Sequence, residues 1–151
     1  MRKTTRGRPL ATLLPLFLLA TACTGSTPSA TAVDVTLQEW AVVPAISSAP
    51  PGTVTFLVTN DGPADIHEFV ILRTDLDPGA LPTDEHGAVV QDGEGIEVVD
   101  ELEDIPVGQT RDITLDLEAG RYVLLCNIYT ADEDEAHYAM GMRTAFTIEG
   151  G

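Results

Sequence analysis

Residues 121–148 read RYVLLCNIYTADEDEAHYAMGMRTAFTI, and this stretch decides the fold. Tyr122, Leu124 and Cys126 alternate with their neighbours, and Phe146 and Ile148 do the same near the end. A period of two is typical of β-strands, because successive side chains of a strand lie on opposite faces. We therefore expect two strands here, joined by an acidic loop that holds a histidine and two methionines.

The same alternation recurs earlier in the chain, within residues 33–38, 53–60 and 112–117. In the second of these segments, Val54, Phe56 and Val58 share one face. Turns rich in Gly, Pro, Asn and Asp separate the segments, and no long stretch has a clean helical period. Several short strands with turns between them predict an all-β fold, a Greek-key sandwich or barrel.

One segment interrupts this pattern. Residues 76–95, LDPGALPTDEHGAVVQDGEG, are polar, rich in Gly and Pro, and too long for a hairpin turn. We expect them to form one long, exposed insertion loop, with His86 solvated within it.

A second histidine and the cysteine occupy ends of apolar runs. In DIHEFVIL, residues 65–72, His67 shares its phase with Phe69 and Ile71 and stands at the start of the run. Cys126 stands at the finish of its own run. Both side chains are therefore predicted to point inward at a rim of the fold, where a metal ion could be held away from water.

The first 22 residues have the features of an export signal. Four basic residues precede a short apolar segment that Pro15 interrupts, and small residues precede Cys23. This arrangement is similar to a bacterial lipobox, in which the signal is removed and the cysteine is lipidated. We expect residues 23–32 to be a flexible tether on the outer face of the cytoplasmic membrane or in the periplasm, and 33–150 to be the domain. A plain secretory signal followed by a chance cysteine is the alternative.

Removal of residues 1–22 would leave four basic and 24 acidic residues, a formal net charge of −20. Such a surface repels nucleic acid and anionic lipid headgroups. It suits cationic redox partners, although a compositional bias of the source organism explains it equally well. The Asp132–Glu135 run is best interpreted as solvated charge.

The sequence gives little support to an enzyme. No Ser/His/Asp order stands out, and no Gly-rich phosphate-binding loop is present.

A lipidated Cys23 would leave Cys126 without a disulfide partner, and a free exported thiol is a liability unless it is buried or bound to metal.

His67, Cys126, His137 and Met142 together supply two imidazoles, a thiolate and a thioether. Two histidines and a cysteine with a weak axial methionine make up a blue copper site. A zinc site more often has paired cysteines or histidines at short spacings. Each residue taken alone would more often fill a core.

The segment resembles the cupredoxins, the blue copper proteins. HYAMGM is similar to the pseudoazurin-like motif, whose axial methionine stands five residues after the second histidine, which favours Met142 over Met140. NDGPADIHEFVIL, residues 60–72, resembles the strand that carries the family's first histidine. The resemblance implies a Greek-key β-sandwich that holds one copper ion, cycles it between Cu(I) and Cu(II), and transfers electrons without being an enzyme.

Two positions depart from the family's pattern. Ten residues separate Cys126 from His137, where the family usually has a few. An outward bulge of the extra segment could leave the ligands in place, and the effect of this loop stays open at this point. Glu68 follows the first histidine, where many relatives have a residue that supports the cysteine sulfur by hydrogen bonding.

Three functions remain open at this point. The first is a membrane-tethered electron carrier that acts with redox partners at the membrane. The second is a copper-delivery lipoprotein with an exchangeable metal. The third is a sandwich that has lost its metal and binds a protein. Trp40 is interpreted as a core or edge aromatic rather than a redox relay.

Overall fold

The computed structural model describes residues 30–150, so the predicted signal peptide, Cys23 and most of the predicted tether lie outside the described residues. The elements are β1 (Thr31–Gln38), β2 (Ala41–Pro44), β3 (Ser48–Ala49), β4 (Gly52–Gly62), β5 (His67–Arg73), β6 (Glu97–Ile105), β7 (Thr110–Leu117), β8 (Gly120–Leu125), β9 (Tyr129–Thr130), β10 (Glu135–Ala136), α1 (His137–Met140) and β11 (Arg143–Ile148). Among the described residues, no helix is long and apolar enough to cross a membrane.

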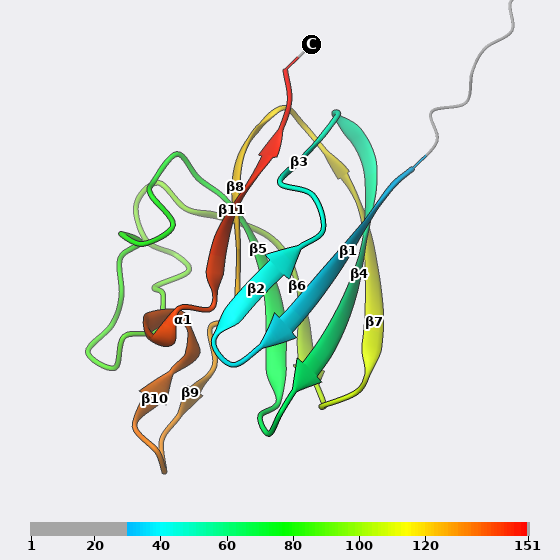
Figure 1. The fold of residues 1–151 in the computed structure, drawn as a ribbon. Coiled ribbons are helices and arrows are strands. Elements are labelled where there is room, and N and C mark those ends of the chain that lie inside the picture. The colour runs from blue at the N-terminus through cyan, green and yellow to red at the C-terminus, as the bar shows by residue number, and fades with distance from the viewer. Residues whose placement is uncertain (1–29, 151) are drawn as a thin grey trace, which may run out of the picture.

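Two sheets pack face to face (Figure 1). One has the strand order β2-β1-β4-β7 and the other β3-β11-β8-β5-β6, while β9 and β10 form a separate hairpin. The β1–β4 and β11–β3 pairs are parallel, and the other pairs are antiparallel. The predicted all-β sandwich is confirmed.

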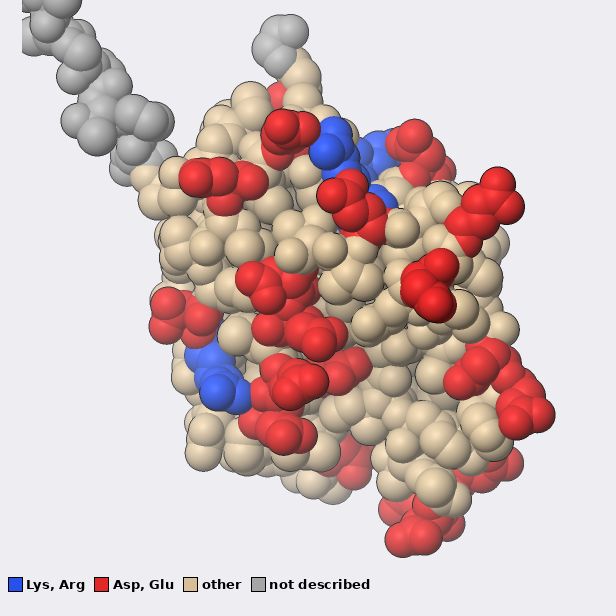
Figure 2. All heavy atoms as spheres, turned by 180° about the vertical axis from the view of Figure 1, so that it is seen from behind, with Lys and Arg blue, Asp and Glu red and all other residues tan. Residues whose placement is uncertain are grey.

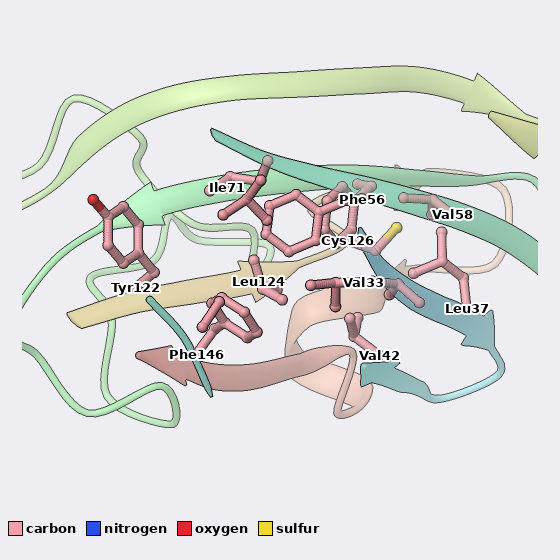
Figure 3. Packing of buried hydrophobic residues seen from close by; sticks show 14 of the residues in the cluster. Val33, Leu37, Val42, Phe56, Val58, Ile71, Tyr122, Leu124, Cys126 and Phe146 are labelled. Atoms are coloured by element: carbon pink, nitrogen blue, oxygen red, sulfur yellow. The ribbon is translucent and has the colours of Figure 1, made fainter. Parts of the chain in front are cut away.

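The main core lies between the two sheets, where the alternating residues meet (Figure 3). Phe56 of β4 packs against Phe69 of β5 and Phe146 of β11, with ring centroids 5.4 and 5.5 Å apart. These tilted and edge-on contacts are the arrangements that aromatic rings prefer. Cys126 belongs to the same core cluster, between Phe56 and Val58 in Figure 3.

The long insertion between β5 and β6 is polar and mostly exposed, as predicted. Two of its apolar residues, Leu81 and Val89, are nevertheless buried in a second, smaller core on the outer face of the sheet. Tyr138 of α1 holds this loop, since its hydroxyl donates to the Pro78 carbonyl at 2.7 Å and accepts from the Leu81 N–H at 3.1 Å. The insertion is therefore fastened to the loop that carries the candidate ligands.

Strand β6 shows no clear alternation in the sequence. It is an edge strand with five carboxylates among its nine residues, and it pairs with β5 through two register shifts. A bulge puts consecutive residues out of phase, and an edge strand needs few buried positions. The sequence pattern that identifies the other long strands is for this reason absent here.

Candidate metal centre

Four elements bring the candidate ligands to one end of the sandwich. His67 is the first residue of β5, and Cys126 directly follows β8. Because β5 and β8 are antiparallel neighbours, the start of one lies beside the end of the other. His137 begins α1, and Met142 directly precedes β11, the other neighbour of β8.

Three of the four side chains converge on one point. Cys126 Sγ lies 3.3 Å from His137 Nδ1 and 3.9 Å from His67 Nδ1, and the two Nδ1 atoms lie 3.2 Å apart. The ligand atoms of the three residues all lie within 4.8 Å of one another, and the three residues are buried. Two imidazoles and a thiol that meet in a dry site fit a transition metal that accepts both nitrogen and sulfur.

The long segment between Cys126 and His137 does not separate these residues. Strands β9 and β10 fold it into a hairpin that projects from the sandwich (Figure 1). The His137 N–H donates to the Ile128 carbonyl at 2.9 Å and closes the hairpin at its base. The extra residues therefore bulge outward, and the two ligand candidates lie side by side.

The structure distinguishes the two methionines. Met142 is fully buried in the core cluster that contains Cys126. Its carbonyl accepts from the Cys126 N–H at 3.1 Å, and its N–H donates to the His137 carbonyl at 3.0 Å. Met140 is 46% exposed. An axial thioether has to be buried close to the thiol, and Met142 is buried in the same cluster and bonded through its backbone to Cys126, so Met142 remains the axial candidate.

Glu68 contacts Cys126 through its backbone, while its side chain binds the residue that follows Cys126. Its backbone N–H donates to Cys126 Sγ at 3.4 Å, so the sulfur has a donor whatever side chain stands here. The Glu68 carboxylate accepts from the Asn127 N–H at 2.8 Å. The Asn127 amide in turn exchanges two hydrogen bonds with the backbone of Val89 in the insertion loop. Glu68 and Asn127 are thus held next to Cys126 by a hydrogen bond to each other and, through the Asn127 amide, by two hydrogen bonds to the insertion loop.

Burial sets the protonation of the three candidate ligands. Burial lowers the pKa of His67, and the nearby His137 lowers it further, while Glu39 and Asp65 act in the opposite direction. The pKa of His137 is likewise lowered by burial. Burial raises the pKa of the Cys126 thiol to about 12. At neutral pH both imidazoles can therefore offer a lone pair, whereas the thiol has to lose a proton when a metal binds.

Two residues beside the site were not predicted as part of it. Trp40 is half-buried against the main core, as expected of a core or edge aromatic, and its ring meets His137 edge-on with centroids 5.1 Å apart. The Glu39 carboxylate lies 3.8 Å from His67 Nε2. Both residues form the turn between β1 and β2, and nothing in the sequence links this turn to His67.

The remaining candidates lie outside the cluster. His86 stacks on Tyr129 of the hairpin, with centroids 4.5 Å apart, and its side chain is substantially exposed. The acidic run occupies the hairpin tip and is largely exposed, as expected of solvated charge. Tyr129 donates from its hydroxyl to Asp134 at 2.8 Å.

No protein-family model and no curated protein matches the sequence. Solved structures do match. A reduced auracyanin from the photosynthetic bacterium Roseiflexus castenholzii is 24% identical, with a TM-score of 0.56 over 80% of this chain and 98% of its own. Reduced rusticyanin is 19% identical, with a TM-score of 0.55 over 82% of each chain. An azurin from Methylomonas sp. strain J is 16% identical, with a TM-score of 0.52 over 80% of this chain and 98% of its own. The chain therefore has the fold of the auracyanins, rusticyanin and azurin, which is the fold that its resemblance to the cupredoxins implied.

Proposed function

We propose that this protein is a type 1 copper electron carrier. His67, Cys126 and His137 would hold one copper ion, and Met142 would be its weak axial ligand. The observation that carries the proposal is the convergence of one thiol and two imidazoles within 4.8 Å in a buried site. One thiolate with two imidazoles and a thioether suits copper, which both sulfur and nitrogen bind well.

Copper bound here would supply one-electron chemistry by cycling between Cu(I) and Cu(II). The chain contributes a rigid set of donors, because His67 and Cys126 stand at the ends of neighbouring core strands. The Glu68 N–H supports the sulfur when it is a thiolate, since a hydrogen bond to a charged acceptor is stronger than one to a neutral acceptor. A fixed and dry donor set limits rearrangement between the two oxidation states.

The burial of the site also favours electron transfer over copper delivery. A delivery protein needs donors that a partner can reach in order to take the metal. His67 and Cys126 are fully buried here, and His137 is almost so. Electrons can cross a thin layer of protein, whereas ions cannot.

The proposal also covers the redox partner of the protein and its location in the cell. We infer that the chain is exported, that Cys23 carries lipid, and that the domain acts close to the outer face of the cytoplasmic membrane. Carboxylates are scattered across the face seen in Figure 2, and basic side chains occur there in only a few places. Such a surface favours redox partners with a cationic docking face and speeds their association at low salt.

The decisive test is the visible spectrum after Cu(II) is added to the purified protein. A cysteine–copper bond in a type 1 site gives intense visible absorption, so we expect a blue or green protein that ascorbate bleaches. Cys126→Ser should abolish the colour. His86→Ala is the matched control, because it removes a histidine outside the cluster and should leave the colour unchanged. Stoichiometric copper in a colourless wild-type protein would refute the proposal and favour copper delivery.

The tether is tested separately by Cys23→Ser. The variant should move from the membrane fraction to the soluble exported fraction with its spectrum unchanged. Multiple acyl chains anchor a protein firmly, whereas a single chain does so only marginally. Wild-type protein that is exported but unlipidated would exclude the anchor without affecting the copper site.

A further inference from the structure

Glu39 lies in the turn between β1 and β2, far from His67 in the sequence. Its side chain is only 11% exposed and reaches the loop that leads into β5. There Glu39 Oε1 accepts two backbone hydrogen bonds, from the Ala64 N–H at 3.0 Å and from the Asp65 N–H at 2.7 Å. These bonds fix the carboxylate two to three residues before the candidate ligand.

Two buried polar atoms remain without a partner at this place. Within the described part of the chain, Glu39 Oε2 and His67 Nε2 are the buried side-chain nitrogen and oxygen atoms that make no hydrogen bond. They belong to neighbouring groups, since the other oxygen of the same carboxylate, Glu39 Oε1, lies 3.8 Å from His67 Nε2. Buried polar groups in folded proteins are almost always paired, so two neighbouring exceptions point to an incomplete contact between these two residues.

The chemistry of His67 indicates what completes it. Its Nδ1 faces Cys126 Sγ and His137 Nδ1, so Nδ1 is the atom that would donate its lone pair to a metal. A neutral imidazole carries its single proton on the other nitrogen. Metal bound at Nδ1 therefore makes Nε2 a donor that points away from the metal and needs an acceptor. A ligating histidine usually finds such an acceptor in a carboxylate, a carbonyl or water.

We propose that Glu39 is a positioning residue, whose carboxylate accepts a hydrogen bond from His67 Nε2–H once a metal occupies Nδ1. The two groups need to approach by only about 1 Å to reach hydrogen-bonding distance. The bond fixes the tautomer and the ring orientation of His67. The negative charge of the carboxylate makes His67 Nδ1 a stronger electron-pair donor to the metal, and this favours Cu(II) over Cu(I). This inference rests on the proposed function for its effect on the potential, but its geometry applies to any metal bound at Nδ1.

The experiment compares Glu39→Gln and Glu39→Ala with the wild type by two measurements. The first is solvent exchange of the His67 ring N–H, followed by NMR in the Zn(II)-loaded protein. The second is the reduction potential of the copper protein, measured by voltammetry. Asp65→Asn is the matched control, since it removes a neighbouring charge that acts on His67 but keeps the backbone N–H that holds Glu39.

We expect a slowly exchanging ring proton in the wild type and in Glu39→Gln, whose amide oxygen can still accept, and fast exchange in Glu39→Ala. Glu39→Gln should raise the potential, because it keeps the hydrogen bond and loses the charge. A tenfold loss of Cu(II) affinity relative to Cu(I), the lower end of typical effects of such residues, corresponds to 59 mV for one electron. Asp65→Asn should give a smaller shift and an unchanged ring proton.

Unchanged exchange in Glu39→Ala would overturn the proposal, and so would a Glu39→Gln potential equal to that of the wild type. If Glu39→Ala does not fold, the potential of Glu39→Gln decides. If the wild type binds Cu(II) without colour, the proposed function fails, and ring-proton exchange in the Zn(II) proteins still decides the role of Glu39.

Discussion

Because the Cys126 thiol is buried, we predict how strongly the affinity for Cu(I) depends on pH. In the proposed site Cu(I) would bind the thiolate form of Cys126, whose thiol has a pKa raised to about 12 by burial. Below that value each unit of pH changes the thiolate fraction tenfold. The lowered pKa values of His67 and His137 keep both imidazoles neutral above pH 7, so they add nothing to this slope.

The expected magnitude follows directly. Between pH 7 and pH 10 the apparent affinity for Cu(I) should rise about 1,000-fold, or about 4 kcal/mol at 1.36 kcal/mol per pH unit. A thiol at its ordinary pKa would already be mostly ionised at pH 10. The gain over the same range would then stay under about 100-fold and would level off above pH 9.

The assay is anaerobic competition for Cu(I) against a coloured chelator whose own affinity is constant over this range. Cys126→Ser is the control, and its much weaker binding should have almost no slope between pH 7 and pH 10. Proton release measured in a lightly buffered solution should be close to one per Cu(I) bound. A plateau near pH 9 in the wild type, or binding without proton release, would contradict the assignment of a buried, protonated Cys126 as ligand.

Three further predictions concern the axial ligand, the hairpin and the core. Met142→Leu should keep copper and colour but raise the reduction potential, because a weaker axial donor favours Cu(I), while Met140→Leu should change little; the opposite result by voltammetry would refute the ligand assignment. Replacement of residues 129–136 by two glycines should preserve copper binding, since His137 already bonds to the backbone at the base of the hairpin, and should weaken binding to a cationic partner measured at low salt. Phe56→Ala should destabilise the copper-free protein by about 3–5 kcal/mol in chemical denaturation, because the side chain is fully buried among aromatic rings; a loss below about 1 kcal/mol would contradict the observed packing.

Much of the fold could be predicted from local patterns. Alternation alone identified the faces of β1 and β4, because a strand that is buried on one side must place every second residue in the core. The same rule placed His67 and Cys126 at inward positions on the rim. It failed for β6, whose bulged and acidic edge position leaves no regular pattern to detect.

The sequence by itself determined the strands that alternate regularly and the types of donor, since these depend on residue identity and on spacing along one stretch of chain. The preference for Met142 over Met140 came from the resemblance to the cupredoxins and stays a prediction. Only the tertiary structure decided that ten intervening residues fold away as a hairpin and leave Cys126 and His137 in contact. It also decided that a backbone N–H, rather than a side chain, supports the sulfur, and that Glu39 faces His67. These contacts join segments from different strands and turns, and their geometry depends on how the two sheets pack. The spacing of residues along the chain does not predict that packing, whereas alternation within a strand does predict which side of the strand faces the core.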